Sequence, residues 1–176
     1  MAITRLGPNQ SVNLASNVTG TLPAANVANS TLTNVTALPA GVGGKVLQAV
    51  TTKFETETTT TSTSFVSTPL AASITPSATS SKVLILLGGV IYINQDQKYY
   101  YGTVYRASTD LGNSAMVITR NNAGGGGTNL SSSLLDSPST TSATTYTYYH
   151  KVDSGATGFL SINNYTSTIT LLEIGA

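Results

Sequence analysis

The longest apolar run of the chain, SKVLILLGGVIYIN at residues 81–94, is the feature that most constrains the fold. It is too short for a membrane-spanning helix, which needs about 20 apolar residues. Its β-branched content favours a strand buried on both faces, although periodicity alone does not separate such a strand from a short buried helix. The pair Gly88-Gly89 disfavours the helix, because each glycine costs about 1 kcal/mol relative to alanine in a helix interior. We predict a central strand in which this pair marks a bulge or the close approach of another backbone.

The composition indicates an all-β protein. Of the 176 residues, 40% are hydrophobic and only 9% are charged, whereas about 25% are charged in an average soluble domain. Threonine, serine, asparagine and glycine take the place of charge; threonine favours strands and the other three favour turns. We predict a jelly-roll-like β-sandwich head over residues 45–176, preceded by an extended N-terminal segment over residues 1–44.

Regularly spaced apolar and alternating stretches predict about eight strands in the head. Gly102 is expected to form a bulge, and Pro69 indicates an edge strand or a bend. The glycine-rich residues 121–129 are expected to form a mobile loop, and residues 131–135 fit a short strand or a helical turn. The predicted strands are 45–61, 64–70, 81–94, 98–108, 115–119, 144–152, 158–163 and 167–174.

Residues 1–44 have a character of their own. An Asn-Val-Thr unit followed by Leu-Pro-Ala occurs at residues 17–24 and again at 34–41, and no aromatic residue interrupts it. Such a segment cannot bury a core alone, and its prolines disfavour a continuous strand. The regular spacing of valine and leucine favours an extended segment, ordered by copies of itself or by another protein, over a flexible linker. The candidate docking residues are Ile3, Leu6, Val12, Leu14, Val18 and Leu22.

The side chains offer little for catalysis. The chain has no cysteine, and its one histidine, His150, lies in a predicted strand, where a surface or packed position is more common than a catalytic one. Glu55 and Glu57 share one face of a predicted strand, where they fit a solvated edge better than a glycosidase pair. We therefore predict no enzymatic activity, no catalytic residue, no metal site and no cofactor.

The charge and the N-terminal residues bear on partners and location. A formal net charge of +1 provides no field to attract nucleic acid or an anionic membrane. No apolar signal region follows Arg5, so we expect synthesis in a cytoplasm without export by the general route. Neither nucleic-acid binding nor membrane insertion is expected.

The nine tyrosines are the most informative side chains. Alternation places Tyr99, Tyr101 and Tyr105 on one face of their strand if no bulge intervenes, and Tyr146 and Tyr148 on one face of theirs. Tyrosine combines contact area with a polar tip and is enriched at interfaces. A half-buried sheet face, a subunit interface and a carbohydrate-binding surface all remain open. These five tyrosines are the candidate receptor or interface surface.

Five segments carry a resemblance to a known family. They are MAITRLG at 1–7, VTGTLPA at 18–24, AGVGGKVLQ at 40–48, SITPSATSSKVL at 73–84 and STITLLEI at 167–174. Together they resemble the small tail-fibre-like structural proteins of marine and freshwater bacteriophages, cyanophages especially. The resemblance implies a virion protein, usually a homotrimer, with a thin N-terminal attachment segment and a C-terminal β-sandwich head. Its motifs carry no catalytic residue.

We therefore expect a non-enzymatic virion structural protein: a homotrimeric short fibre anchored to the particle by its N-terminal segment. Its head would attach to the host surface, with other copies of the chain, capsid or tail proteins and a host-surface glycan as partners. One alternative is a capsid decoration protein that cements neighbouring subunits, since 176 residues are few for a fibre that must reach a cell. The other is a carbohydrate-binding sandwich module unrelated to virions.

Overall fold

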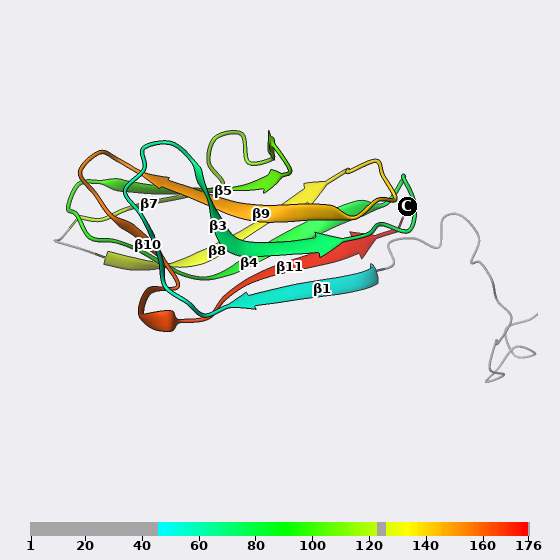
Figure 1. Cartoon of the computed structure of the whole chain (residues 1–176), viewed down its shortest axis with the longest axis horizontal. Helices are drawn as coiled ribbons and strands as arrows, with labels where there is room; N and C mark the ends of the chain where they lie inside the picture. Colours follow the sequence, from blue (N-terminus) through cyan, green and yellow to red (C-terminus); the bar gives the residue numbers. More distant parts are fainter. Residues whose placement is uncertain (1–45, 123–125, 176) are drawn as a thin grey trace, which may run out of the picture. The chain divides into compact units, whose positions relative to one another are not determined.

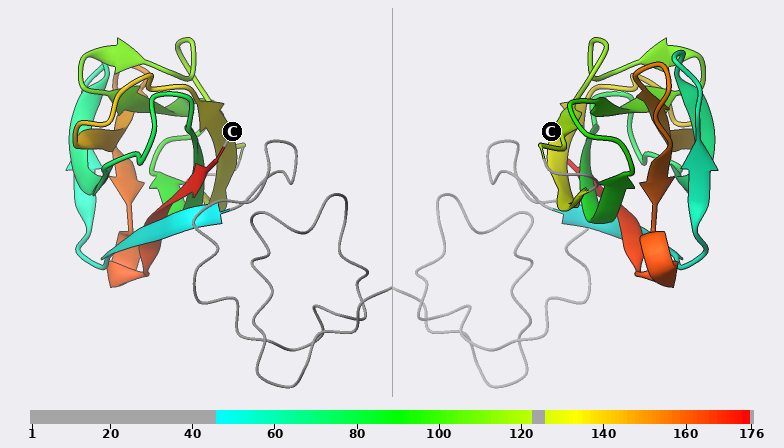
Figure 2. Two further views of the ribbon diagram at one scale, coloured as in Figure 1. Left: turned by 90° about the vertical axis from the view of Figure 1, so that its right-hand side faces the viewer. Right: turned by 90° about the vertical axis from the view of Figure 1, so that its left-hand side faces the viewer.

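The computed structural model describes residues 46–122 and 126–175. Within them two antiparallel sheets pack face to face, with β3, β9 and β5 above β4, β11 and β1 in Figure 1, and with two further views in Figure 2. The predicted all-β sandwich is confirmed. No helix of the described residues is long and apolar enough to cross a bilayer. The elements are β1 (Val46–Phe54), β2 (Thr58–Thr60), β3 (Val66–Ile74), β4 (Lys82–Ile93), β5 (Tyr99–Arg106), β6 (Thr109–Asp110), β7 (Val117–Arg120), β8 (Gly126–Asp136), β9 (Thr144–Val152), β10 (Gly158–Leu160), the 3-10 turn η2 (Ile162–Asn164) and β11 (Ser167–Ile174).

The strand order is that of a jelly roll. Sheet A has the order β8-β4-β11-β1, and further along β4 the short strands β10 and β2 take the places of β11 and β1. Sheet B has the order β3-β9-β5, with β6 and β7 both on the far edge of β5. Eight of the described strands have more than three residues: β1, β3, β4, β5, β7, β8, β9 and β11. Consecutive strands of this set lie in opposite sheets, except for β5 and β7. Two such antiparallel sheets joined by crossings of this kind form a jelly roll.

The central strand of sheet A is β4, as predicted. It pairs with β8 from Val83 to Ile93 on one edge, and β11 and β10 share the other edge. The side chains of Val83 and Ile85 point into the core and are fully buried. Burial on both faces is wrong, however, because the outward-facing Leu86 is 36% exposed.

The pair Gly88-Gly89 lies where the neighbour of β4 changes from β11 to β10. Register with β8 is continuous through the pair, so the predicted bulge is absent. A Cβ atom on Gly89 would overlap the Ser167 hydroxyl and lie 2.9 Å from the Ser167 Cα. The other prediction, the close approach of a second backbone, is confirmed.

The strand β8 corrects one prediction and decides between the alternatives of another. Residues 126–129, predicted to lie in a loop, and residues 131–135, predicted to form a short strand or a helical turn, lie in one continuous strand beside β4. The loop is therefore wrong for 126–129, and the strand is right for 131–135. Serine, glycine and asparagine have weak strand propensity, so the sequence carries little local signal for β8. Pairing along the whole of β4 and burial of Leu130 stabilise it instead.

Three smaller outcomes concern the strand edges. The predicted strand 45–61 is divided into β1 and β2. Gly102 forms no bulge, because β5 pairs with both neighbours without a register shift; a Cβ there would overlap the Tyr148 hydroxyl. Pro69 does lie in an edge strand, β3, within its register shift against β9.

Candidate binding surfaces

The five candidate tyrosines divide between the two faces of sheet B. Tyr146 and Tyr148 of β9 point into the core and are fully buried, so their predicted place on a receptor or interface surface is wrong. Tyr99, Tyr101 and Tyr105 of β5 are partly exposed on the outer face, where unbroken alternation puts them together. Alternation groups the tyrosines correctly, but only the packing of the second sheet decides which group is buried.

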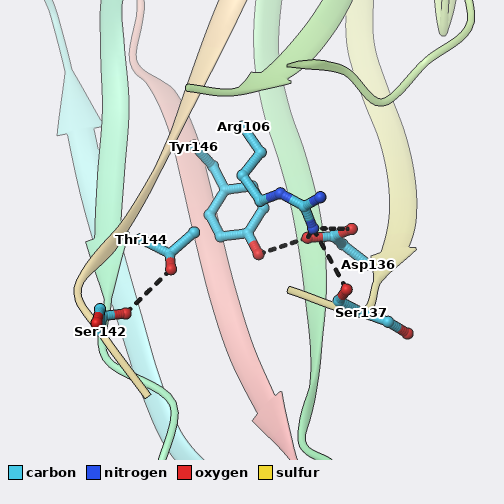
Figure 3. A network of polar contacts seen from close by, with 6 residues as sticks. All are labelled: Arg106, Asp136, Ser137, Ser142, Thr144 and Tyr146. Carbon is cyan, nitrogen blue, oxygen red and sulfur yellow. Dashed lines mark hydrogen bonds and ion pairs between the residues drawn. The ribbon is translucent and has the colours of Figure 1, made fainter. Parts of the chain in front are cut away.

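Tyr146 belongs to a polar cluster that joins the two sheets (Figure 3). Its hydroxyl donates a hydrogen bond of 2.7 Å to Asp136 Oδ2, and Arg106 Nη1 lies 2.7 and 2.6 Å from the two oxygens of that carboxylate. Burial, and then the hydrogen bond to Asp136, raises the pKa of Tyr146. Because Asp136 ends β8 of sheet A whereas Arg106 and Tyr146 lie in sheet B, the cluster fastens one sheet to the other.

His150 takes the packed position of its two predicted alternatives. The ring is buried on the inner face of β9, and its Nδ1 lies 3.1 Å from the Tyr100 hydroxyl oxygen. Burial lowers the pKa of His150 to about 4. The imidazole is therefore neutral near pH 7 and serves as a packed partner of Tyr100.

A row of aromatic side chains on the outer face of sheet B forms the first candidate surface. Tyr99 and Tyr101 stack with their ring centroids 5.9 Å apart. The ring centroid of Tyr105 lies 4.1 Å from that of Tyr149 and 6.4 Å from that of Phe65. All five side chains are partly exposed. We call Phe65, Tyr99, Tyr101, Tyr105 and Tyr149 the aromatic strip. Sequence alternation alone would have separated Tyr149 from its buried neighbours, whereas nothing in the sequence identifies Phe65.

Two cationic side chains lie against the aromatic strip. The Nζ of Lys151 is 4.7 Å from the ring centroid of Phe65 and 5.0 Å from that of Tyr101. The guanidinium carbon of Arg120 lies 5.5 Å from the ring centroid of Tyr99. A cation within about 6 Å of a ring centroid is attracted by the ring quadrupole. Both cations are therefore held at defined places on the surface.

Two carboxylates lie beside the same strip, and both accept hydrogen bonds from the head itself. Asp153 accepts from the Tyr99 backbone N–H at 2.9 Å and from the Tyr101 hydroxyl at 3.4 Å. Asp110 accepts from the Thr103 hydroxyl at 2.6 Å and from two backbone N–H groups of the loop after β6. Partial burial, and then the charge of Asp153, raises the pKa of Tyr101. The Tyr101 phenol is therefore neutral near pH 7.

The outer face of sheet A is the second candidate surface. Strand pairing places Ala49, Leu172, Leu84 and Leu135 in one row across β1, β11, β4 and β8, and Leu86 lies on the same face of β4. Leu86 and Leu135 are 36% and 52% exposed, and Leu84 and Leu172 are partly exposed. We call Leu84, Leu86, Leu135 and Leu172 the leucine face.

The leucine face has no acidic side chain around it. The acids of its four strands are Asp136 and Glu173, and both lie on the inward-facing register of β4 beside Val83. Burial opposes the ionisation of Glu173, but hydrogen bonds from Ser77 and Gln48 outweigh it and lower the pKa to about 2. The negative charge of this sheet is therefore directed inward and satisfied there.

The remaining candidate residues are Glu55 and Glu57, predicted to share one strand face. Glu55 and Glu57 lie in the connection between β1 and β2, not on one strand face, and both are exposed. Glu55 lies 3.2 Å from the Nζ of Lys53, and Glu57 accepts a hydrogen bond from the Asn163 N–H at 3.0 Å. Within the described part of the chain no three metal-ligating side chains come together. The six predicted docking residues, and the predicted boundary at residue 44, lie outside it.

The geometry thus defines a jelly-roll head with an aromatic strip on one outer face and a leucine face on the other. No protein-family model matches the chain. A search of curated proteins found no match either.

Proposed function

We propose that the chain is a non-enzymatic structural protein of a bacteriophage virion. It forms a homotrimeric short fibre whose N-terminal segment anchors it to the particle and whose head attaches to the host surface. Two features support this at the level of analogy. Viral capsid domains and lectins use the jelly roll, and segments such as 1–7 and 167–174 resemble those of tail-fibre-like proteins.

The observation that carries the proposal is the leucine face. In a single head Leu86 and Leu135 remain 36% and 52% exposed. Strands lie about 4.8 Å apart and rise about 3.3 Å per residue, so each outward side chain covers about 32 Å² and the five apolar side chains, Ala49 included, together cover about 160 Å² of the face. Burying one leucine fully contributes about 1.5–3 kcal/mol. Further burial of these leucines therefore favours association through this face.

A second copy of the chain suits the leucine face better than a charged partner does. The face carries no acid, and the nearest cations on it, Lys53 and Lys82, lie at its margins in the register of the sheet. Three leucine faces turned toward a common axis would exclude water from one another. The number three rests on the family resemblance, and the leucine face supports self-association.

Capsid decoration is the second candidate, and the same face favours it. In that case the leucine face would lie on a capsid subunit and not on another copy of the chain. A decoration protein would be a monomer before it reaches the capsid. The location of the protein on the particle separates the two functions.

Immunogold labelling of purified phage particles, with antibodies raised against the isolated protein, tests the proposal. Label on the tail is the expected result, and label over the whole capsid would support decoration. Particles without label, and without the protein by mass spectrometry, would overturn both. A variant that lacks residues 1–20 should fold but stay off the particle, because the candidate docking residues up to Val18 are removed.

A further inference from the structure

The aromatic strip carries positive charge that no ion pair among the described residues neutralises. Lys151 lies over the rings of Phe65 and Tyr101, and Arg120 lies over the ring of Tyr99. A cation over an aromatic ring keeps its full charge, because the attraction is to a quadrupole and not to an anion. The ion pairs of the described residues lie elsewhere, at Lys53–Glu55 and Arg106–Asp136.

Hydrogen-bond donors and acceptors are also unequal on this surface. The Lys151 ammonium makes ring contacts but donates no hydrogen bond to the residues that the structure describes. The nearby carboxylates of Asp153 and Asp110, in contrast, already accept hydrogen bonds from the head. A ligand that complements the strip must therefore supply the acceptor, and a charged acceptor binds an ammonium more strongly than a neutral one does.

We infer that the aromatic strip binds acidic carbohydrate, with a sugar carboxylate on the Nζ of Lys151. The sugar rings lie against the exposed parts of Tyr99 and Tyr101, which offer apolar area with a polar tip. Arg120, beside Tyr99, supplies a second cation along the same row. This inference rests on the proposed attachment of the head to a host surface, and it names the class of glycan.

Three pairs of polymers test the inference: polygalacturonate, alginate and hyaluronate, each with its methyl-esterified form as the matched neutral ligand. Calorimetric titration of the whole protein should show at least tenfold tighter binding to an acidic polymer than to its ester. Lys151→Met should remove that preference, whereas Lys151→Arg should keep it. Tyr101→Ala should weaken binding to both forms. Lys53→Met, which removes an exposed cation from sheet A, is the matched control and should change nothing.

The outcomes separate this inference from the proposed function. Equal binding to acid and ester would overturn the role of Lys151 but leave a carbohydrate-binding head intact. Binding to none of the three acidic polymers would overturn the inference as a whole. Neither result alters the expected immunogold label on the particle, so the proposed virion function is tested separately by the labelling experiment.

Discussion

Leu84 stands in register with Leu135, so that two leucines of neighbouring strands lie side by side on the outer face of sheet A. Along β11 the outward positions change from Thr168 and Thr170 to Leu172, and the apolar end of that strand meets the same row. A sheet that only faced water would favour polar residues at all of these positions. The apolar end therefore marks the part of the sheet where a partner is expected.

Replacing the two most exposed leucines of this face should separate the copies. In the double variant Leu86→Asn, Leu135→Asn, two amides replace apolar side chains in the expected interface, so the mass in solution should fall from trimer to monomer. The head should remain folded, because exposed substitutions usually change stability by less than about 0.5 kcal/mol. Thr145→Asn, exposed on the opposite sheet, is the matched control. An unchanged mass of the double variant by light scattering would show that another surface joins the copies.

The cluster around Asp136 should be a main fastening between the sheets. Arg106→Met leaves a carboxylate that is 9% exposed without its cation, and removing one partner of such a buried pair costs about 3–5 kcal/mol. Tyr146→Phe removes one hydrogen bond to a charged group and should cost about 1.5–3 kcal/mol. Urea unfolding at a fixed protein concentration measures both.

An exposed ion pair supplies the comparison for that experiment. Lys53 and Glu55 have side chains that are 66% and 57% exposed. Lys53→Met should therefore change the free energy of unfolding by less than about 1 kcal/mol. If Arg106→Met is no more costly than Lys53→Met, the cluster does not hold the sheets together.

Gly102 should tolerate no larger side chain. A Cβ atom there would overlap the ring of buried Tyr148, so Gly102→Ala should destabilise the head by about 1–3 kcal/mol or more through overpacking. Gly127→Ala is the matched control, because its nearest contacts would be at 3.6 and 3.8 Å. Combining Gly102→Ala with Tyr148→Leu should restore part of the loss in thermal unfolding. Additive losses in the double variant would rule out this explanation.

The buried His150 should make stability depend on pH below neutrality. Burial lowers its pKa in the folded head to about 4 from the ordinary 6.5, so the unfolded chain binds a proton that the folded head excludes. The stability that neutral His150 contributes is present above pH 6.5 and is lost as the pH falls toward 4. At pH 5 the free energy of unfolding should be lower by roughly 2 kcal/mol. Urea unfolding at pH 7 and pH 5 should show this loss for the wild type and not for His150→Gln. An equal loss in the variant would assign it to other groups.

Glu173 should act in a lower pH range. Its pKa in the folded head, about 2, lies below the ordinary 4.5, so the folded state prefers the carboxylate. The stability that it contributes is present above pH 4.5 and is lost as the pH falls through the range down to 2. Glu173→Gln should weaken the dependence of the free energy of unfolding on pH, and only in this pH range. Unchanged acid sensitivity would contradict the account of this carboxylate.

The sequence predicts those elements whose signal is local. The run that becomes β4 and the alternation of β9 and β11 contain their own burial pattern, and the predicted bounds of β9 and β11, 144–152 and 167–174, are confirmed. The sequence predicts a strand only as one alternative for residues 131–135 of β8 and misses its first half. The serines and glycines carry little strand signal, and the partner strand β4 lies more than 30 residues earlier in the chain. Gly102 was misread for a similar reason: the Tyr148 ring that needs its space belongs to another strand.

The candidate surfaces show the same division between local and non-local information. Alternation grouped Tyr99 with Tyr101 and Tyr146 with Tyr148, because side chains alternate along any strand. Which pair meets water depends on where sheet A packs, and no local pattern contains that. The register of Leu84 with Leu135 and Leu172 depends on three strands that are distant in sequence, so the leucine face was not visible before the fold.

The mass of the purified protein in solution tests the central claim most directly. Light scattering across the micromolar concentration range should give three times the 18.1 kDa mass of the chain, because three leucine faces bury one another. A mass of one chain at every concentration would contradict the homotrimeric fibre and leave capsid decoration as the better account of the leucine face.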